Sequence, residues 1–162
     1  MAGIRDIVES DFGSIIKLND AEVLQTSPMD LSRLRLLIQA SSYCKVATVE
    51  GQVVAFVIAL GVGTSYENDN YNWFSARFPS FLYVDRIIVS ADYSGHRIGS
   101  KLYAGMFDFA RARGIRMIAC EYNIEPPNPA SRVFHTGFGF KEVGAQWVSN
   151  GTKQVSLQIV ET

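Results

Sequence analysis

The sequence has few of the features that mark disulfide-bonded or membrane-spanning proteins. Its 162 residues include only two cysteines, Cys44 and Cys120, which are far apart and form no CxxC pair. We expect both to be reduced and buried, with a single disulfide as the alternative. The longest apolar run, residues 53–60, is much shorter than the roughly 20 residues that a helix needs to span a bilayer. A disulfide scaffold and a helical membrane protein are therefore not expected.

The chain also lacks an excess of charge of either sign. It has 15 Lys and Arg residues against 16 Asp and Glu, for a net charge of -1. This balance argues against nucleic acid or an anionic membrane as a partner. No basic stretch followed by an apolar run opens the chain, so no signal peptide is expected. No repeat or low-complexity linker divides residues 1–162, and we predict a single-domain cytoplasmic enzyme or binding module.

Hydrophobic spacing predicts two helices after a short strand at residues 4–8. Ser10 is the expected N-cap of the first helix and Asp30 that of the second. Residues 45–50 and 52–60 then predict a hairpin around Glu50-Gly51, whose second strand is apolar on both faces and therefore central. The inward-facing positions expected in the two helices are Phe12, Ile15, Ile16 and Asn19, and then Leu31, Leu34, Leu37 and Ile38.

The second half alternates strands with helices. After a polar and aromatic connection at residues 61–79, the longest expected helix spans residues 98–113 and ends at Gly114. Asn128-Pro129 is expected to open a shorter helix that Gly137 stops. Strands are expected at residues 81–89, 115–122, 140–148 and 153–160. The predicted order is β-α-α-β-β-β-α-β-α-β-β, one mixed α/β domain.

A glycine-containing turn in residues 84–103, VDRIIVSADYSGHRIGSKLY, carries the first chemical signal. A strand runs through a turn with Gly95 and Gly99 directly into the longest helix. Free backbone N–H groups and the positive end of a helix dipole suit a phosphate or pyrophosphate. The turn is neither a P-loop nor a GxGxxG motif, and a simple glycine-packed helix start is the alternative.

Residues 128–140, NPASRVFHTGFGF, resemble the C-terminal signature of the GNAT acetyltransferase superfamily, and residues 87–93 resemble its fourth strand. The positions in register with that signature are Asn128, Ser131, Phe134, Gly139 and Phe140. The resemblance extends over residues 4–160. It implies the GNAT fold: a single α/β domain with a mixed, mostly antiparallel sheet of six or seven strands flanked by about four helices.

The resemblance also implies an activity and a cofactor. The expected reaction is acetyl transfer from acetyl-CoA to a primary amine, by direct attack in a ternary complex. Backbone groups of Ile87, Ile88 and Val89 would bind the pantetheine arm of CoA. Asn128 and Phe134 would also lie at the cofactor, although Asn128 is equally expected as a helix N-cap. The amides expected to cradle the pyrophosphate are those of Ser94, Gly95, His96, Arg97, Ile98, Gly99 and Ser100.

Three residues depart from the family pattern. Ser94 replaces a Gln or Arg, and Arg97 replaces the first glycine of the pyrophosphate loop. A Cβ at position 97 crowds the phosphate unless the guanidinium compensates by pairing with it. His135 stands where the family has a tyrosine that protonates the CoA thiolate. Histidine is able to donate a proton near neutral pH, and the alternative is a histidine that only fills space at a helix end.

The acceptor amine must lose a proton before it attacks, so a base is required. Asp85 is the first candidate and Glu121 the second, with a salt bridge to the neighbouring Arg86 as the alternative role for Asp85. An amide of Ile88 or Val89 is expected to stabilise the oxyanion.

Residues 61–79 are too long for a plain hairpin turn, and their aromatic and acidic residues suit a cationic amine. Tyr66, Tyr71 and Trp73 are therefore the candidate acceptor-binding residues, with a surface flap or a homodimer contact as the alternative. The acceptor is a small-molecule or peptide amine, and no metal is expected. A non-catalytic acyl-CoA sensor on the same fold is the competing function, while the 128–140 signature argues against a nucleotide-binding protein.

Overall fold

A seven-stranded sheet with the order β1-β2-β3-β4-β5-β7-β6 organises the molecule. The computed structural model describes residues 2–23 and 25–162. The strands are β1 (Gly3–Asp6), β2 (Tyr43–Val49), β3 (Gln52–Leu60), β4 (Leu82–Val89), β5 (Met117–Glu125), β6 (Lys141–Val148) and β7 (Lys153–Glu161). The α-helices are α1 (Phe12–Ala21), α2 (Leu31–Ala40), α3 (Asp69–Ser75), α4 (Ile98–Ala112) and α5 (Pro129–Gly137).

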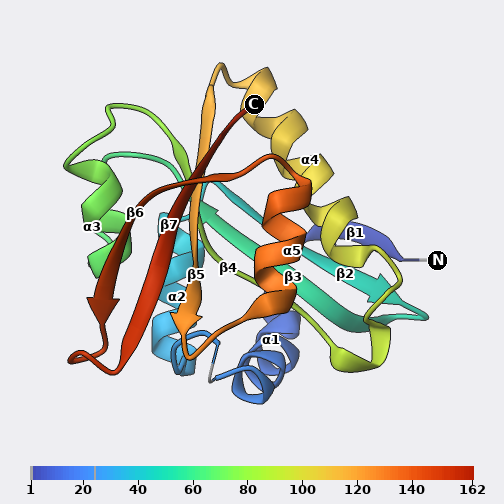
Figure 1. Cartoon of the computed structure of the whole chain (residues 1–162). Helices are drawn as coiled ribbons and strands as arrows, with labels where there is room; N and C mark the ends of the chain where they lie inside the picture. The colour runs from blue at the N-terminus through green and yellow to red at the C-terminus, as the bar shows by residue number, and fades with distance from the viewer. Residues whose placement is uncertain (1, 24) are drawn as a thin grey trace.

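Strand β3 is buried on both faces, as its continuous apolar sequence predicts. Phe56, Ile58 and Leu60 point into one core, which also holds buried side chains of α1, α2 and α3. Ala55 and Val57 point into a second core, under α4 and α5. Two layers of helices therefore sandwich the sheet (Figure 1), and the predicted α/β fold class is confirmed.

The predicted start of the first helix needs correction. Ser10 is not the N-cap, because residues 9–11 form a short 3-10 turn and α1 begins at Phe12 after Asp11. The Asp11 carboxylate accepts a hydrogen bond from the Val8 amide at 2.9 Å and pairs with Arg5 at 2.8 Å, which holds this turn.

The second helix begins as expected. The side chain of Asp30 accepts from the amide of Arg33 at 2.8 Å. Leu34 and Leu37 of this helix are buried, but Leu31 is 45% exposed, so the first turn of α2 does not face the core.

The connection at residues 61–79 is not a plain loop. It contains α3, whose N-cap Asn68 accepts hydrogen bonds from the amides of Asn70 at 2.9 Å and Tyr71 at 3.0 Å. Asn68 is a recognisable N-cap, but a helix of two turns contains too few hydrophobic repeats to be recognised from the sequence.

Strands β4 and β5 are the parallel neighbours in a sheet whose other pairs are antiparallel. They pair only at Leu82 with Ile118 and at Tyr83 with Ala119. Beyond Tyr83 the two strands diverge, so the β5 side of the later part of β4 has no strand partner within the described chain. Each strand is then followed by a helix, β4 by α4 and β5 by α5, and α5 stands in front of the sheet beside β5 (Figure 1).

No helix in the described ranges is long and apolar enough to cross a bilayer. Cys44 on β2 and Cys120 on β5 are free thiols.

Candidate active site

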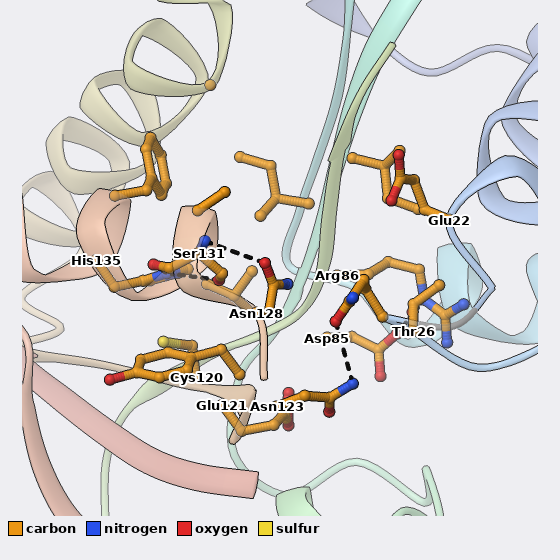
Figure 2. A pocket seen from close by; sticks show the side chains of 18 of the residues that line it. Glu22, Thr26, Asp85, Arg86, Cys120, Glu121, Asn123, Asn128, Ser131 and His135 are labelled. Atoms are coloured by element: carbon orange, nitrogen blue, oxygen red, sulfur yellow. Dashed lines mark hydrogen bonds and ion pairs between the residues drawn. The ribbon is translucent and has the colours of Figure 1, made fainter. Parts of the chain in front are cut away.

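A cavity of about 690 Å³ occupies the space where β4 and β5 diverge. Its walls come from β4, β5, the turn before α4, α5, and the connection between α1 and α2. Figure 2 shows Asn128 and His135 on one side of this cavity and Arg86, Thr26 and Glu22 on the other. The cofactor-binding residues predicted from the sequence that line it are Ile87, Ile88, Val89, Ser94, Gly95, Arg97, Ile98, Gly99, Ser100, Asn128 and Phe134.

The turn before α4 presents a row of free amides. The N–H groups of Ile98, Gly99 and Ser100 form the first turn of α4 and have no backbone acceptor in the part of the chain that the structure describes. The amides of Gly95 and Arg97 likewise have no acceptor in those ranges. Five free N–H donors at the positive end of a 15-residue helix suit a phosphate-bearing ligand such as CoA.

Two residues of this turn do not contribute as predicted. The amide of His96 donates to the Tyr93 carbonyl at 3.4 Å, and its exposed side chain does not line the cavity. The amide of Ser94 donates to the Ala91 carbonyl at 3.3 Å. These bonds close the short 3-10 turn at Ala91–Tyr93, so the free amides of the segment within the described ranges are those of Gly95 and residues 97–100.

Arg97 takes the conformation that glycine takes most readily. Its φ is 60°, in the left-handed region, and that of Gly95 is 81°. A non-glycine residue is strained there. The backbone at position 97 thus keeps the shape expected for the family's glycine, while an exposed guanidinium is added beside the free amides.

Phe134 packs directly against this turn. A Cβ added to Gly99 would lie 3.3 Å from Phe134 Cε1 and 3.6 Å from Val89 Cγ2. Glycine at position 99 therefore allows α4, α5 and the end of β4 to meet closely.

Asn128 serves as the N-cap of α5, as its position before a proline predicts. Its Oδ1 accepts from the Ser131 amide at 3.2 Å, while its side chain also lines the cavity. The Nδ2 group has no acceptor among the residues that the structure describes, so Asn128 remains able to donate into the cavity.

His135 is buried and makes hydrogen bonds through both ring nitrogens. Its Nδ1 lies 2.8 Å from the Ser131 carbonyl oxygen, and its Nε2 lies 2.7 Å from the Tyr103 hydroxyl. Burial lowers the pKa of His135. Tyr103 also lines the cavity, although the sequence analysis did not select it, because nothing local to α4 points to a residue 32 positions away.

Glu121 lies at the other end of the cavity, near the point where β5 leaves β4. Removal from water raises the pKa of this half-buried carboxyl to about 8. The hydrogen bond from the Tyr83 hydroxyl opposes this shift, whereas the nearby charge of Asp85 adds to it. A carboxyl with this pKa is suited to accept and release protons near neutral pH.

Asp85 is held in an ion pair. Its Oδ2 lies 2.7 Å from Nε of Arg86, and its Oδ1 accepts a hydrogen bond of 2.5 Å from the Tyr66 hydroxyl. The Asp85 side chain is 1% exposed and that of Arg86 3%. A carboxylate that is paired with a buried guanidinium is less available as a base, and this favours Glu121 over Asp85 as the candidate.

The three predicted acceptor-binding aromatics lie outside the cavity lining. Tyr66 is buried with its hydroxyl on Asp85, and Tyr71 is buried with its hydroxyl 2.7 Å from the Gly61 carbonyl oxygen. Trp73 packs against β6, where a Cβ on Gly144 would lie 2.5 Å from its ring. The segment instead presents three polar residues to the cavity, namely Asn68, Asp69 and Asn70.

Within the described residues, no group of three or more His, Cys, Asp or Glu side chains is arranged to hold a metal ion.

The cavity lies between two diverging strands, β4 and β5, and next to a helix N-terminus with free amides. Such a site suits a long ligand that carries phosphate groups. The acetyltransferase (GNAT) family matches residues 2–140, and the chain belongs to this family. GNAT enzymes use acetyl-CoA, so the chain is an acyl-CoA-dependent acyltransferase with acetyl-CoA as its cofactor.

Solved structures share the fold over nearly the whole chain. The ribosomal-protein-S18-alanine N-acetyltransferase of Escherichia coli is 15% identical, with 99% of this chain and 94% of that chain covered and a TM-score of 0.74. Ard1 from Thermoplasma volcanium is 15% identical, with 99% and 97% covered and a TM-score of 0.81. The ribosomal-protein-alanine N-acetyltransferase of Brucella melitensis is 21% identical, with 99% of both chains covered and a TM-score of 0.74. A search of curated proteins finds no match.

Proposed function

We propose that the protein transfers the acetyl group of acetyl-CoA to a primary amine of a small molecule or peptide, by direct attack while both substrates are bound. The observation that carries this proposal is the half-buried Glu121, a carboxyl of pKa about 8 on the wall of the cavity between β4 and β5. Acetyl-CoA, when bound, supplies the activated acetyl group.

Glu121 is the base in this proposal. An arriving ammonium has no lone pair and must give up a proton before it attacks. The Glu121 carboxylate accepts that proton, and Tyr83 holds its Oε1 in place through a hydrogen bond. Asp85 is paired with Arg86, and its charge adds to the raised pKa of Glu121.

The CoA-binding part of the proposal rests on the backbone. The free amides of Gly95 and Arg97–Ser100 hold the pyrophosphate, and the unpaired edge of β4 at Ile87–Val89 lies beside the pantetheine arm. An amide of Ile88 or Val89 would stabilise the oxyanion. Arg97 adds a cation next to the phosphates, and Asn128 donates from the opposite wall.

The part played by His135 remains a prediction. The bonds of its ring favour a neutral imidazole whose Nε2 accepts from Tyr103, and such a ring does not donate from Nε2. This geometry supports a role in holding α5 against α4 more directly than the role of general acid. The leaving thiolate then takes its proton from water or from the acceptor nitrogen.

Thermal shift with acetyl-CoA, ATP and NAD tests the binding step. Acetyl-CoA at millimolar concentration should raise the melting temperature, whereas ATP and NAD should not, because only a native-state ligand stabilises by mass action. Release of the CoA thiol is then measured over a panel of small amines and short peptides. Binding without amine-dependent thiol release would favour the competing function, a non-catalytic acyl-CoA sensor. No shift with acetyl-CoA would overturn both functions.

A further inference from the structure

One buried guanidinium ties together two segments that are far apart in the sequence. Arg86 on β4 donates from Nε to Asp85 at 2.7 Å and from Nη1 to Asn19 Oδ1 at 2.8 Å. It also donates to Ser27, from Nη1 to the carbonyl oxygen at 3.1 Å and from Nη2 to Oγ at 3.0 Å. Arg86 is 6% exposed and Asn19 is fully buried.

Asn19 lies near the end of α1, and Ser27 lies in the connection between α1 and α2. Asn19 lies in the last turns of α1, and its Nδ2 donates to the Ser27 carbonyl at 2.9 Å. The hydrogen bonds of Arg86 and Asn19 therefore join the end of α1, strand β4 and Ser27. Between the two tied residues lie three that line the cavity, namely Glu22, Gln25 and Thr26, and we call these three residues together with Ser27 the acceptor wall.

The acceptor wall is also hydrogen-bonded to strands β5 and β7. Lys153 Nζ donates to the Thr26 carbonyl at 2.9 Å, and Asn123 Nδ2 lies 3.4 Å from Gln25 Oε1. Lys153 and Asn123 each make one of these bonds, whereas Arg86 joins β4 to Asn19 and Ser27 through three. The position of the wall relative to β4 thus depends mainly on Arg86.

Asp85 and Tyr66 determine where the Arg86 side chain points. Tyr66 donates to Asp85 Oδ1, which leaves Oδ2 for the guanidinium. A buried ion pair contributes little net stability because desolvation offsets its Coulomb energy, and its best-supported use is to select one arrangement of the groups around it. In Figure 2, Arg86 extends from β4 toward Thr26, on the side of the cavity away from α5.

We propose that Arg86 is a positioning residue that holds the acceptor wall at a set distance from β4 and thereby determines which amines reach the thioester. The inference rests on the proposed function, because β4 is the strand beside which the pantetheine arm lies. Arg86 directly precedes the segment Ile87–Val89, so the same strand places both the acyl donor and the wall that faces it. The substrate class that this arrangement selects is an amine that fits between the acceptor wall and β4.

The test is the double variant Asp85→Asn/Arg86→Gln, which removes both buried charges, leaves neither charge unpaired, and replaces the guanidinium by a shorter side chain with a single NH2 group. Its KM for the acceptor amine should rise about tenfold with a smaller change in kcat, because a displaced wall misplaces the acceptor. The Kd for acetyl-CoA should stay within about twofold, since the amides of the turn before α4 are untouched. Hydrogen exchange of residues 20–28 should become faster, while that of α4 does not.

The matched control is Glu9→Gln/Arg35→Gln, which removes an ion pair of 2.6 Å between side chains that are 69% and 48% exposed. This control should leave KM and the exchange of residues 20–28 unchanged. Unchanged exchange and unchanged KM in the Asp85/Arg86 variant would overturn the proposal. If the wild type releases no thiol with any amine, the proposed function fails, and the exchange measurement still decides whether Arg86 holds the wall.

Should the double variant fail to fold, Asn19→Ala decides the question, because it leaves the Asp85–Arg86 ion pair in place and removes one anchor of the wall. Faster exchange confined to residues 20–28 in Asn19→Ala supports the proposal. Exchange that matches the wild type contradicts it.

Discussion

Tyr103 donates its hydroxyl proton to Nε2 of His135 across 2.7 Å, in a site where both residues are buried. The direction of this bond follows from the other side of the ring. Nδ1 lies 2.8 Å from the Ser131 carbonyl oxygen and 3.1 Å from the Ser131 hydroxyl oxygen. The carbonyl is the nearer partner and only accepts hydrogen bonds, so we assign the ring proton to Nδ1 and the acceptor role to Nε2. The pair joins α4 to α5, the two helices that close the cavity.

Nitrogen NMR should show His135 as the neutral Nδ1–H tautomer at pH 7. In Tyr103→Phe the Nε2 atom loses its donor, and its chemical shift should move to that of an unbonded imidazole nitrogen. The free energy of unfolding should fall by about 1–3 kcal/mol, because a buried acceptor is left without a partner. An imidazolium signal for His135 at pH 7 in the wild type would instead restore it as a general acid.

The lowered pKa of His135 predicts how stability depends on pH. Its pKa in the folded protein lies below the unfolded value of 6.5, because burial disfavours the charged ring. As pH falls below about 6.5, the unfolded chain binds a proton that the folded protein does not yet bind, so this contribution to stability is lost. Urea unfolding at pH 7.5 and pH 5.0 should show a larger loss for the wild type than for His135→Gln. His96 is exposed and present in both proteins, so it cancels in the comparison. Equal losses in the two proteins would mean that burial does not perturb His135.

Arg97 combines a strained backbone with a useful charge, and two variants separate these effects. Arg97→Gly removes the strain at φ 60°, whereas Arg97→Ala keeps it, so the glycine variant should be more stable by about 1 kcal/mol. Both lose the guanidinium and should bind acetyl-CoA less tightly than the wild type, with Arg97→Gly the tighter of the two. Urea unfolding and titration calorimetry measure the two effects. If both variants bind like the wild type, the guanidinium does not contact the phosphates.

The packing of Trp73 against β6 predicts a clash at Gly144. A Cβ there would lie 2.5 Å from Trp73 Cζ2, so Gly144→Ala should lower the free energy of unfolding by about 1–3 kcal/mol. Adding Trp73→Leu to this variant should recover part of the loss, because it vacates the same space. Gly13→Ala is the control, since its Cβ would meet nothing within 4 Å. A neutral Gly144→Ala would place the indole elsewhere and make Trp73 available to an acceptor again.

The features that could be predicted from the sequence are those determined by neighbouring residues. Asp30 and Asn128 cap their helices through side-chain oxygens that reach amides three positions on. The apolar run at residues 53–60 identified the central strand, and the strand-turn-helix order around Gly95 identified the anion-binding turn.

The unpredicted features depend on contacts between distant segments. The bonds of Tyr66 to Asp85, Tyr83 to Glu121 and Tyr103 to His135 link residues 19, 38 and 32 positions apart, and no local pattern encodes them. Aromatic residues at 66, 71 and 73 are equally typical of a binding loop and of a packed segment. Only the core formed with α3 decides between these two roles. The order of Asp85 and Glu121 as candidate bases also depends on such contacts, since burial raises the pKa of Glu121 while Asp85 is paired with Arg86.

Amine-dependent release of the CoA thiol, measured as kcat/KM from pH 6 to pH 9, tests the central claim most directly. After correction for ionisation of the acceptor, the wild-type rate should rise with pH through an apparent pKa of about 8, because the base must be ionised. Glu121→Gln should bind acetyl-CoA normally by calorimetry, lose about 10²–10⁴-fold in rate, and lose that inflection. A Glu121→Gln enzyme that keeps both the rate and the inflection would contradict the account.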